Sequence, residues 1–261
     1  MNPFGDPKFE TLERAVREAG AFLMSKWPGG STKDASLTIT QKADGSLVSA
    51  ADMGSNEILM NALSLLFPND FILSEEIESN PADVRAASRV WIVDPLDGTS
   101  AFLEGRDDFS ILVGLSVDRV ALAGLMYFPA RDIMYLAHQG AGVLRNGSRI
   151  AVSPSKEPRP GRIYARHCSL TNRELESPFM DSGLAFAQVA TGELDGAVVR
   201  MKTHREWDLA APMSVLLEAG AKVSDETGRP IEIGVGEISF EYFVVSNGLC
   251  HEAILGLIAR E

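Results

Sequence analysis

The sequence predicts an α+β protein built in layers, αβαβα. Three observations support this fold class: amphipathic helical patterns before residue 67, an antiparallel meander after Ser110, and alternating strands and helices after Gly161. A segment with three prolines, residues 153–161, is the clearest shift in composition. We therefore expect an N-terminal α+β domain over residues 1–152 and a C-terminal α/β domain over 153–261.

The elements of the first domain follow from hydrophobic periodicity and turn residues. Apolar residues recur at helical spacing from Phe9 to Leu23, and Pro68 ends a second helix of the same kind. Between and after these helices we predict a weak strand over 37–41, an Asp-Gly turn over 42–46, a strand over 71–73, a loop over 80–83 and strands over 90–93, 110–117, 121–127 and 132–137. The first sheet is therefore expected to be largely antiparallel and covered by two long helices.

The second domain alternates between short strands and helices. In chain order we predict a strand over 162–165, a helix over 184–190, a strand over 196–199, a helix over 208–219 capped by Asp208, strands at 222–223 and 243–245, and a last helix from Leu249.

One stretch, VWIVDPLDGTSAF at residues 90–102, dominates the chemistry. A buried strand runs into Asp94, Pro95 forces a turn, and Asp97 precedes small residues that open a helix. Two acids suit a hard cation, and the free N–H groups of a helix start suit an anion. A helix cap alone explains one aspartate but not two, so the stretch predicts a metal-plus-phosphate site.

Five acids lie at the ends of predicted elements: Asp52, Glu75, Asp94, Asp97 and Asp208. Four of them lie in the N-terminal domain, which we expect to hold most metal ligands, and Asp208 of the C-terminal domain would complete the site between the two halves. If the acids converge, cations must offset their repulsion. All are oxygen donors, which favours Mg²⁺ or Mn²⁺ over zinc, and the Leu96 carbonyl can add a ligand. From spacing alone, Asp52 fits a structural role in the first turn of its helix, and Asp208 fits a helix cap as well as a metal ligand.

Composition excludes several functional classes. The formal net charge of −12 argues against a nucleic-acid polymer as partner, and no apolar run is long enough for a membrane span. The N-terminus lacks a signal-peptide pattern. Cys168 and Cys250 are too few for a disulfide framework, so we expect free thiols and a cytoplasmic location.

The stretch at 90–102 resembles the signature W-I-V-D-P-L/I-D-G-T-x-x-F of the inositol monophosphatase superfamily. Two further segments are similar to its other signatures, in the expected order: Ile72-Leu73-Ser74-Glu75-Glu76 and Glu206-Trp207-Asp208-Leu209-Ala210-Ala211. The resemblance implies an Mg²⁺-dependent, lithium-sensitive phosphomonoesterase that uses two or three ions and no phosphoenzyme. We also expect a small phosphorylated substrate and a homodimer.

The resemblance also implies roles for single residues. Glu75, Asp94, the Leu96 carbonyl and Asp97 match the ligands of the activating metal, and Asp208 joins Asp94 and Asp97 at a second one. Asp52, Glu75 and Thr99 match the catalytic group that orients the attacking water. Substrate contacts are implied for Asp97, Gly98, Thr99, Ser100, Gly183, Arg200 and Asp208.

The substrate stays open between 3′-phosphoadenosine 5′-phosphate and inositol monophosphate, with histidinol phosphate as a third choice. Arg200 lies where inositol phosphatases carry a glutamate, and an arginine suits a second phosphate or a planar base. Residues 100–102, Ser-Ala-Phe, match neither the K-E-F of bisphosphate nucleotidases nor the T-N-F of inositol phosphatases.

Two other classes share part of the pattern. Haloacid-dehalogenase-like phosphatases use D-x-D-G-T, but here two residues, Pro95 and Leu96, separate the acids and the motif is not near the chain start. A non-catalytic phosphate-binding protein is expected to have lost one of the acids, and none is missing.

Overall fold

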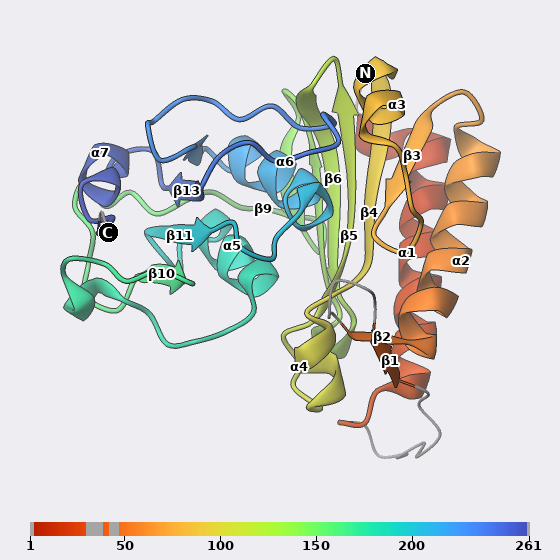
Figure 1. Ribbon diagram of the computed structural model, residues 1–261, viewed down its shortest axis with the longest axis horizontal. Coiled ribbons are helices and arrows are strands. Elements are labelled where there is room, and N and C mark those ends of the chain that lie inside the picture. The colour runs from red at the N-terminus through yellow and green to blue at the C-terminus, as the bar shows by residue number, and fades with distance from the viewer. Residues whose placement is uncertain (1–2, 30–38, 42–46, 260–261) are drawn as a thin grey trace.

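The computed structural model describes residues 3–29, 39–41 and 47–259. Its layers follow the order helix, sheet, helix, sheet, helix, as Figure 1 shows from the long helices on one side to α7 on the other. This arrangement confirms the predicted α+β fold class. The predicted turn over 42–46 and residues 37 and 38 of the predicted strand lie outside the described residues.

The outer helical layer consists of α1 (Pro7–Lys26) and α2 (Ala50–Leu66). Asp6 caps α1 by accepting the Lys8 N–H at 2.8 Å, and Pro7 occupies the first helical position. The buried faces of both helices share one apolar core with the first sheet; it includes Leu12, Val16, Leu59, Leu63, Trp91 and Val113. The sequence periodicity thus predicted both helices, although Leu65, on the apolar side expected for α2, is 83% exposed.

The first sheet has seven strands in sequence order. They are β3 (Phe71–Ser74), β4 (Arg89–Asp97), β5 (Ser110–Val117), β6 (Val120–Phe128), β7 (Ile133–His138), β8 (Gly142–Arg145) and β9 (Ser148–Arg149). Only β3 and β4 pair in parallel, and the remaining neighbours are antiparallel.

The second sheet has the strand order β10-β11-β13-β12. Its strands are β10 (Ile163–Arg166), β11 (Gly196–Arg200), β12 (Lys222–Ser224) and β13 (Tyr242–Ser246). Helices α5 (Ser182–Ala190) and α6 (Ala210–Glu218) lie between the two sheets, and α7 (His251–Leu255) covers the outer face. The middle core joins both sheets, because Leu112 and Met126 of the first belong to one apolar cluster with Phe186 of α5 and Phe243 of β13.

Short elements complete the described chain. They are the hairpin β1 (Ile39–Gln41) and β2 (Leu47–Ser49), helices α3 (Pro81–Ala86) and α4 (Thr99–Leu103), and 3₁₀ turns η1 (Pro3–Gly5), η2 (Pro129–Arg131), η3 (Arg173–Leu175) and η4 (Glu206–Asp208). Among the described helices, none is long and apolar enough to cross a bilayer.

Two local predictions were wrong. Residues 80–83 are not a loop: Asn80 caps α3 by accepting the Ala82 N–H at 2.9 Å, and Pro81 begins the helix. Asp208 does not cap the following helix either. It ends η4, and its Oδ2 accepts the N–H of Arg205, while α6 begins at Ala210 without a side-chain cap.

Candidate active site

A bulge in β4 sets the direction of its two carboxylates. Asp94 pairs with Leu112 and Asp97 with Ser110, so three steps along β4 correspond to two steps along β5. Side chains three residues apart in a regular strand point to opposite faces, whereas one extra residue returns them to the same face. Pro95, which has no N–H to donate to the ladder, lies inside this bulge. The Asp-Pro-Leu-Asp spacing therefore presents both carboxylates on one side of the sheet.

Two glycines bring Asp208 to the same place. Gly114 and Gly124 face each other on β5 and β6 under the start of α6. A Cβ on Gly114 would lie 2.6 Å from the Ala210 Cβ, and one on Gly124 would lie 2.6 Å from the Ala211 carbonyl oxygen. The absence of side chains lets α6 pack directly on the sheet, which positions η4 and Asp208 opposite the β4 carboxylates.

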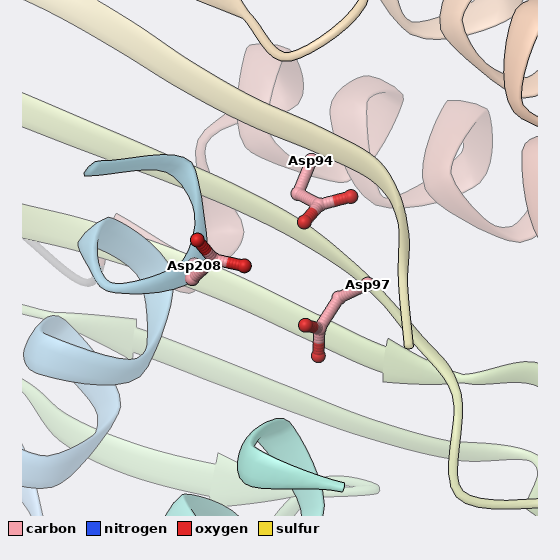
Figure 2. Close-up of side chains that lie close together, drawn as sticks. All are labelled: Asp94, Asp97 and Asp208. Carbon is pink, nitrogen blue, oxygen red and sulfur yellow. The ribbon is translucent and has the colours of Figure 1, made fainter. Parts of the chain in front are cut away.

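Carboxylate oxygens of Asp94, Asp97 and Asp208 all lie within 4.8 Å of one another. Figure 2 shows the three side chains pointing toward a common space, two from β4 and one from the turn before α6. Asp94 and Asp97 are buried, and Asp208 is partly buried. The structure thus brings together the acids from both halves of the chain, as the sequence predicted.

Burial and mutual repulsion perturb these acids. Burial is the main cause that raises the pKa of Asp94 well above its usual value, followed by the charges of Glu75, Asp97 and Asp208. Burial and the charges of Asp181 and Asp208 likewise raise the pKa of Asp97. Burial again dominates for Asp208, whose pKa is raised to about 7. Glu75 therefore lies close enough to act on this cluster.

The donor set fits a hard divalent cation. Every side chain of the cluster offers a carboxylate oxygen, the ligand type that Mg²⁺ and Mn²⁺ prefer. The raised pKa values mean that the ionised carboxylates destabilise one another unless positive charge lies between them. These observations make the acidic cluster a candidate metal centre.

Asp52, Leu96 and Thr99 meet beside the cluster. The Thr99 Oγ1 lies 3.2 Å from the Leu96 carbonyl oxygen and 3.4 Å from Asp52 Oδ1. Asp52 is buried in the first turn of α2, and the Leu96 N–H donates to Asp94 Oδ1 at 3.0 Å. The acid that looked structural from spacing alone therefore contacts the hydroxyl of the candidate catalytic threonine.

Gly98 and Gly183 allow close approach on the other side of Asp97. Gly98 has φ of +79°, and a Cβ there would lie 3.1 Å from the Asp181 carboxyl carbon. A Cβ on Gly183 would meet Asp97 Oδ2, which also accepts the Ser110 hydroxyl at 2.8 Å. Glycine at 183 thus keeps α5 against the β4 carboxylate.

The sequence reasoning missed a further acid, Asp181. It is buried, caps α5 by accepting the Gly183 N–H at 3.1 Å, and donates its own N–H to Asp108 Oδ2 at 2.8 Å. Its charge raises the pKa values of Asp97 and Asp208. The only local signal was an aspartate before a small-residue helix start, which is typical of any N-cap.

A cavity of about 470 Å³ opens in front of these groups. Most of the predicted residues line it: Glu75, Asp97, Gly98, Thr99, Ser100 and Asp208. Residues that the sequence did not single out complete the wall: Glu104, Arg106, Arg166, Phe179, Asp181, Ser182, Thr203 and His204. The cavity is large enough for a small phosphate ester.

Arg200 lies elsewhere. It pairs with Glu241 at 2.7 Å, its guanidinium lies 5.7 Å from the Tyr242 ring centroid, and it lines a separate hollow with residues of β13 and α7. The structure therefore does not bring Arg200 to the cavity that holds the acids. The cause is strand alternation: Arg200 follows Val199, whose side chain shares a sheet face with its partner Arg166.

Comparison with known proteins shows which proteins this chain is similar to. Residues 6–260 match the Inositol monophosphatase family. A histidinol-phosphatase from Chlorobaculum parvum is 29% identical over 207 residues, covering 74% of this chain and 78% of its own. A 3′(2′),5′-bisphosphate nucleotidase CysQ from Escherichia coli O157:H7 is 29% identical, covering 83% and 90%. An IMPase structure from Thermotoga maritima superposes with a TM-score of 0.77 at 25% identity, covering 93% of each chain.

Proposed function

Because the chain belongs to the inositol monophosphatase family, we propose that it is a phosphatase that hydrolyses a small phosphate monoester with Mg²⁺ held by Asp94, Asp97 and Asp208. The observation that carries this proposal is the convergence of three carboxylates from separate elements within 4.8 Å, beside a cavity of suitable size. Mn²⁺ suits the same donors.

Glu75 and the Leu96 carbonyl extend this ligand set in the proposed arrangement of two or three ions. When bound, the metal lowers the pKa of a coordinated water and neutralises charge on the phosphate. The Thr99 hydroxyl donates a hydrogen bond to Asp52 Oδ1, which leaves the Thr99 oxygen free to accept a hydrogen bond from a water. Together with Glu75, this pair orients the water toward phosphorus.

The start of α4 provides the phosphate-binding groups. The first N–H groups of a helix have no intrahelical partner, so those of Gly98, Thr99 and Ser100 can donate to phosphate oxygens. Asp97 and Asp208 flank the same space, and Gly183 keeps it open because any side chain there would meet Asp97. The site is thus completed by groups from both predicted domains.

Phosphate release from a panel of esters tests the activity. Wild-type protein is expected to release phosphate with Mg²⁺, to stop when EDTA removes the metal, and to leave no phosphate covalently bound to protein after acid quenching. A trapped phosphoenzyme would favour an aspartyl mechanism of the haloacid-dehalogenase kind. Binding of phosphate without turnover of any ester would favour a non-catalytic protein.

The same panel decides the substrate among 3′-phosphoadenosine 5′-phosphate, inositol 1-phosphate and histidinol phosphate. Relatives with different printed activities match at similar identity, so similarity alone favours none of them. Inhibition by Li⁺, a homodimer and a cytoplasmic location remain part of the proposal. Enzyme assays with LiCl, light scattering and cell fractionation test these three points.

A further inference from the structure

Phe179 presents an aromatic face at the wall of the cavity. Its side chain is 66% exposed and lines the cavity. Two guanidinium groups lie near its ring: the carbon of Arg166 is 4.8 Å from the ring centroid, and that of Arg106 is 5.7 Å away. Both distances fall within the range of cation–π contacts, so the ring holds the two arginines at the cavity wall.

The two arginines differ in how far the protein neutralises them. Arg106 pairs with Glu104 at 2.8 Å and with Asp108 at 3.1 Å. Arg166 has no carboxylate oxygen within 4.0 Å among the described residues. Its Nε is buried and has no hydrogen-bond partner in that part of the chain. The charge of Arg166 partly offsets the raised pKa of the buried Asp181, but the ion pairs of Arg106 are closer, so Arg166 is the less neutralised of the two arginines.

Arg166 gives this cavity a positive charge, which is the sign that binds a phosphate group. His204 lines the same cavity and is buried, and its pKa is lowered to about 4 by burial and then by the charges of Arg166, His167 and Arg205. His204 is therefore neutral at pH 7, and Arg166 supplies the positive charge. The same cavity is lined by Glu75, Asp97 and Asp208, and a metal held there would engage the phosphate that is cleaved.

We propose that Arg166, held against the face of Phe179, is a specificity-determining residue that binds a second phosphate group of the substrate. The preferred substrate class is then a phosphate monoester whose alcohol carries a further phosphate. A guanidinium on an aromatic face presents a planar set of donors that matches phosphate oxygens. This inference rests on the proposed function and assigns to Arg166 the role that sequence position suggested for Arg200.

Two substrates that differ by one phosphate test the inference. Adenosine 3′-phosphate and 3′-phosphoadenosine 5′-phosphate share the scissile group, and only the second carries the additional phosphate. We expect wild type to prefer the bisphosphate, and Arg166→Gln to reduce the ratio of the two kcat/KM values at least about tenfold. The loss should come mainly through KM of the bisphosphate, since a remote group contributes uniform binding.

Further variants separate recognition from structure. Arg166→Lys should recover part of the preference because it keeps the charge, and Phe179→Leu should reduce the preference because it removes the surface that orients the guanidinium. Fructose 1,6-bisphosphate has two phosphates and no base, so its turnover shows whether the enzyme recognises the second phosphate without a base. Isothermal titration with adenosine 5′-phosphate and adenosine measures the same contact without turnover.

The outcomes are distinct. If Arg166→Gln reduces turnover of both adenosine esters by the same factor, Arg166 only balances the acids of the site, and the inference is wrong. If Arg200→Gln loses the preference for the bisphosphate while Arg166→Gln keeps it, Arg200 binds the second phosphate and the inference is also wrong. If wild type releases phosphate from no ester, the proposed function fails instead.

Discussion

At the scale of single residues, the hydroxyl of Thr99 connects the metal centre to Asp52. Thr99→Ala removes the hydroxyl that lies between the Leu96 carbonyl and Asp52 Oδ1. We expect kcat to fall roughly 10²–10⁴-fold, the usual contribution of a group that positions or transfers a proton. Steady-state assays with saturating Mg²⁺ measure this. Thr99→Ser keeps the hydroxyl and should retain most of the activity, whereas an unchanged rate in Thr99→Ala would make Thr99 only a helix residue.

Asp208 provides a test of repulsion in the metal-free centre. Its pKa is raised in the folded state to about 7, so between pH 4 and 7 the folded protein binds more protons than the unfolded chain. This contribution to stability is present below pH 4 and is lost as the pH rises through 7. Asp208→Asn removes the repulsion and should stabilise the metal-free protein at pH 8 by on the order of 2 kcal/mol, or a few degrees in Tm.

The control is the pH dependence of this gain. The difference in Tm between Asp208→Asn and wild type should shrink as the pH falls toward 4, because Asp208 is then protonated in the folded state and begins to be protonated in the unfolded chain. Scanning fluorimetry in EDTA buffers measures both curves. The sign should reverse in excess Mg²⁺, because only wild type keeps the full ligand set. A variant that is less stable at pH 8 in EDTA would contradict the assigned repulsion.

Three acids of the candidate metal centre could be located from the sequence because each lies at the end of an apolar strand. Asp94 and Asp97 lie in the last part of β4, and Glu75 directly follows β3. Asp181 could not be found this way, since its signal is that of an ordinary helix cap and its approach to Asp97 depends on how α5 packs. The same limit applies to Phe179, which looks like a surface residue until Arg166 is placed beside it.

At the scale of elements, the packing of α6 against the first sheet determines where Asp208 lies. A methyl group on Gly114 would meet backbone atoms of Ala210 and Ala211 at 2.7 Å, and backbone cannot move aside as a flexible side chain can. Gly114→Ala should therefore cost about 1–3 kcal/mol of stability. It should also lower kcat/KM roughly 10–100-fold, because displacement of α6 moves Asp208 from the β4 carboxylates.

Gly5→Ala is the matched control for this substitution. Gly5 is exposed in η1, and a Cβ there would have nothing within 4 Å. The control should keep both Tm and activity. If Gly114→Ala lowered stability but left kcat/KM unchanged, the position of α6 would not determine the geometry of the metal centre.

Elements could be predicted from the sequence where they depend on a local pattern, but not where they depend on pairing between strands. The existence of β4, β5 and the two long helices follows from periodicity within each segment. The bulge at Pro95 and Leu96, however, depends on pairing with β5, and the direction of Arg200 depends on the register of β11 against β10. The register between strands that are distant in the chain cannot be predicted from the local sequence pattern. These two features therefore became visible only in the structure.

At the scale of the whole molecule, the middle core and the metal centre both join the two halves of the chain. Helices α5 and α6 share one apolar cluster with both sheets, and Asp208 completes the cluster begun by Asp94 and Asp97. We therefore expect one cooperative unfolding transition, even though the boundary at residues 153–161 separates two predicted domains. Far-UV circular dichroism and tryptophan fluorescence should give the same Tm.

Magnesium should shift that single transition as a unit. A ligand that binds only the folded state at a free concentration of 100 times its Kd adds about 2.7 kcal/mol, which corresponds to roughly 5–10 °C for a chain of this size. Trp91 lies in the core under α1 and α2, and Trp207 lies next to Asp208, so single-tryptophan variants report on each half. Equal shifts at both positions are expected, because the ion takes ligands from β4 and from the turn before α6. Two transitions, with Mg²⁺ moving only the one reported by Trp207, would mean that the halves fold independently and that the centre does not couple them.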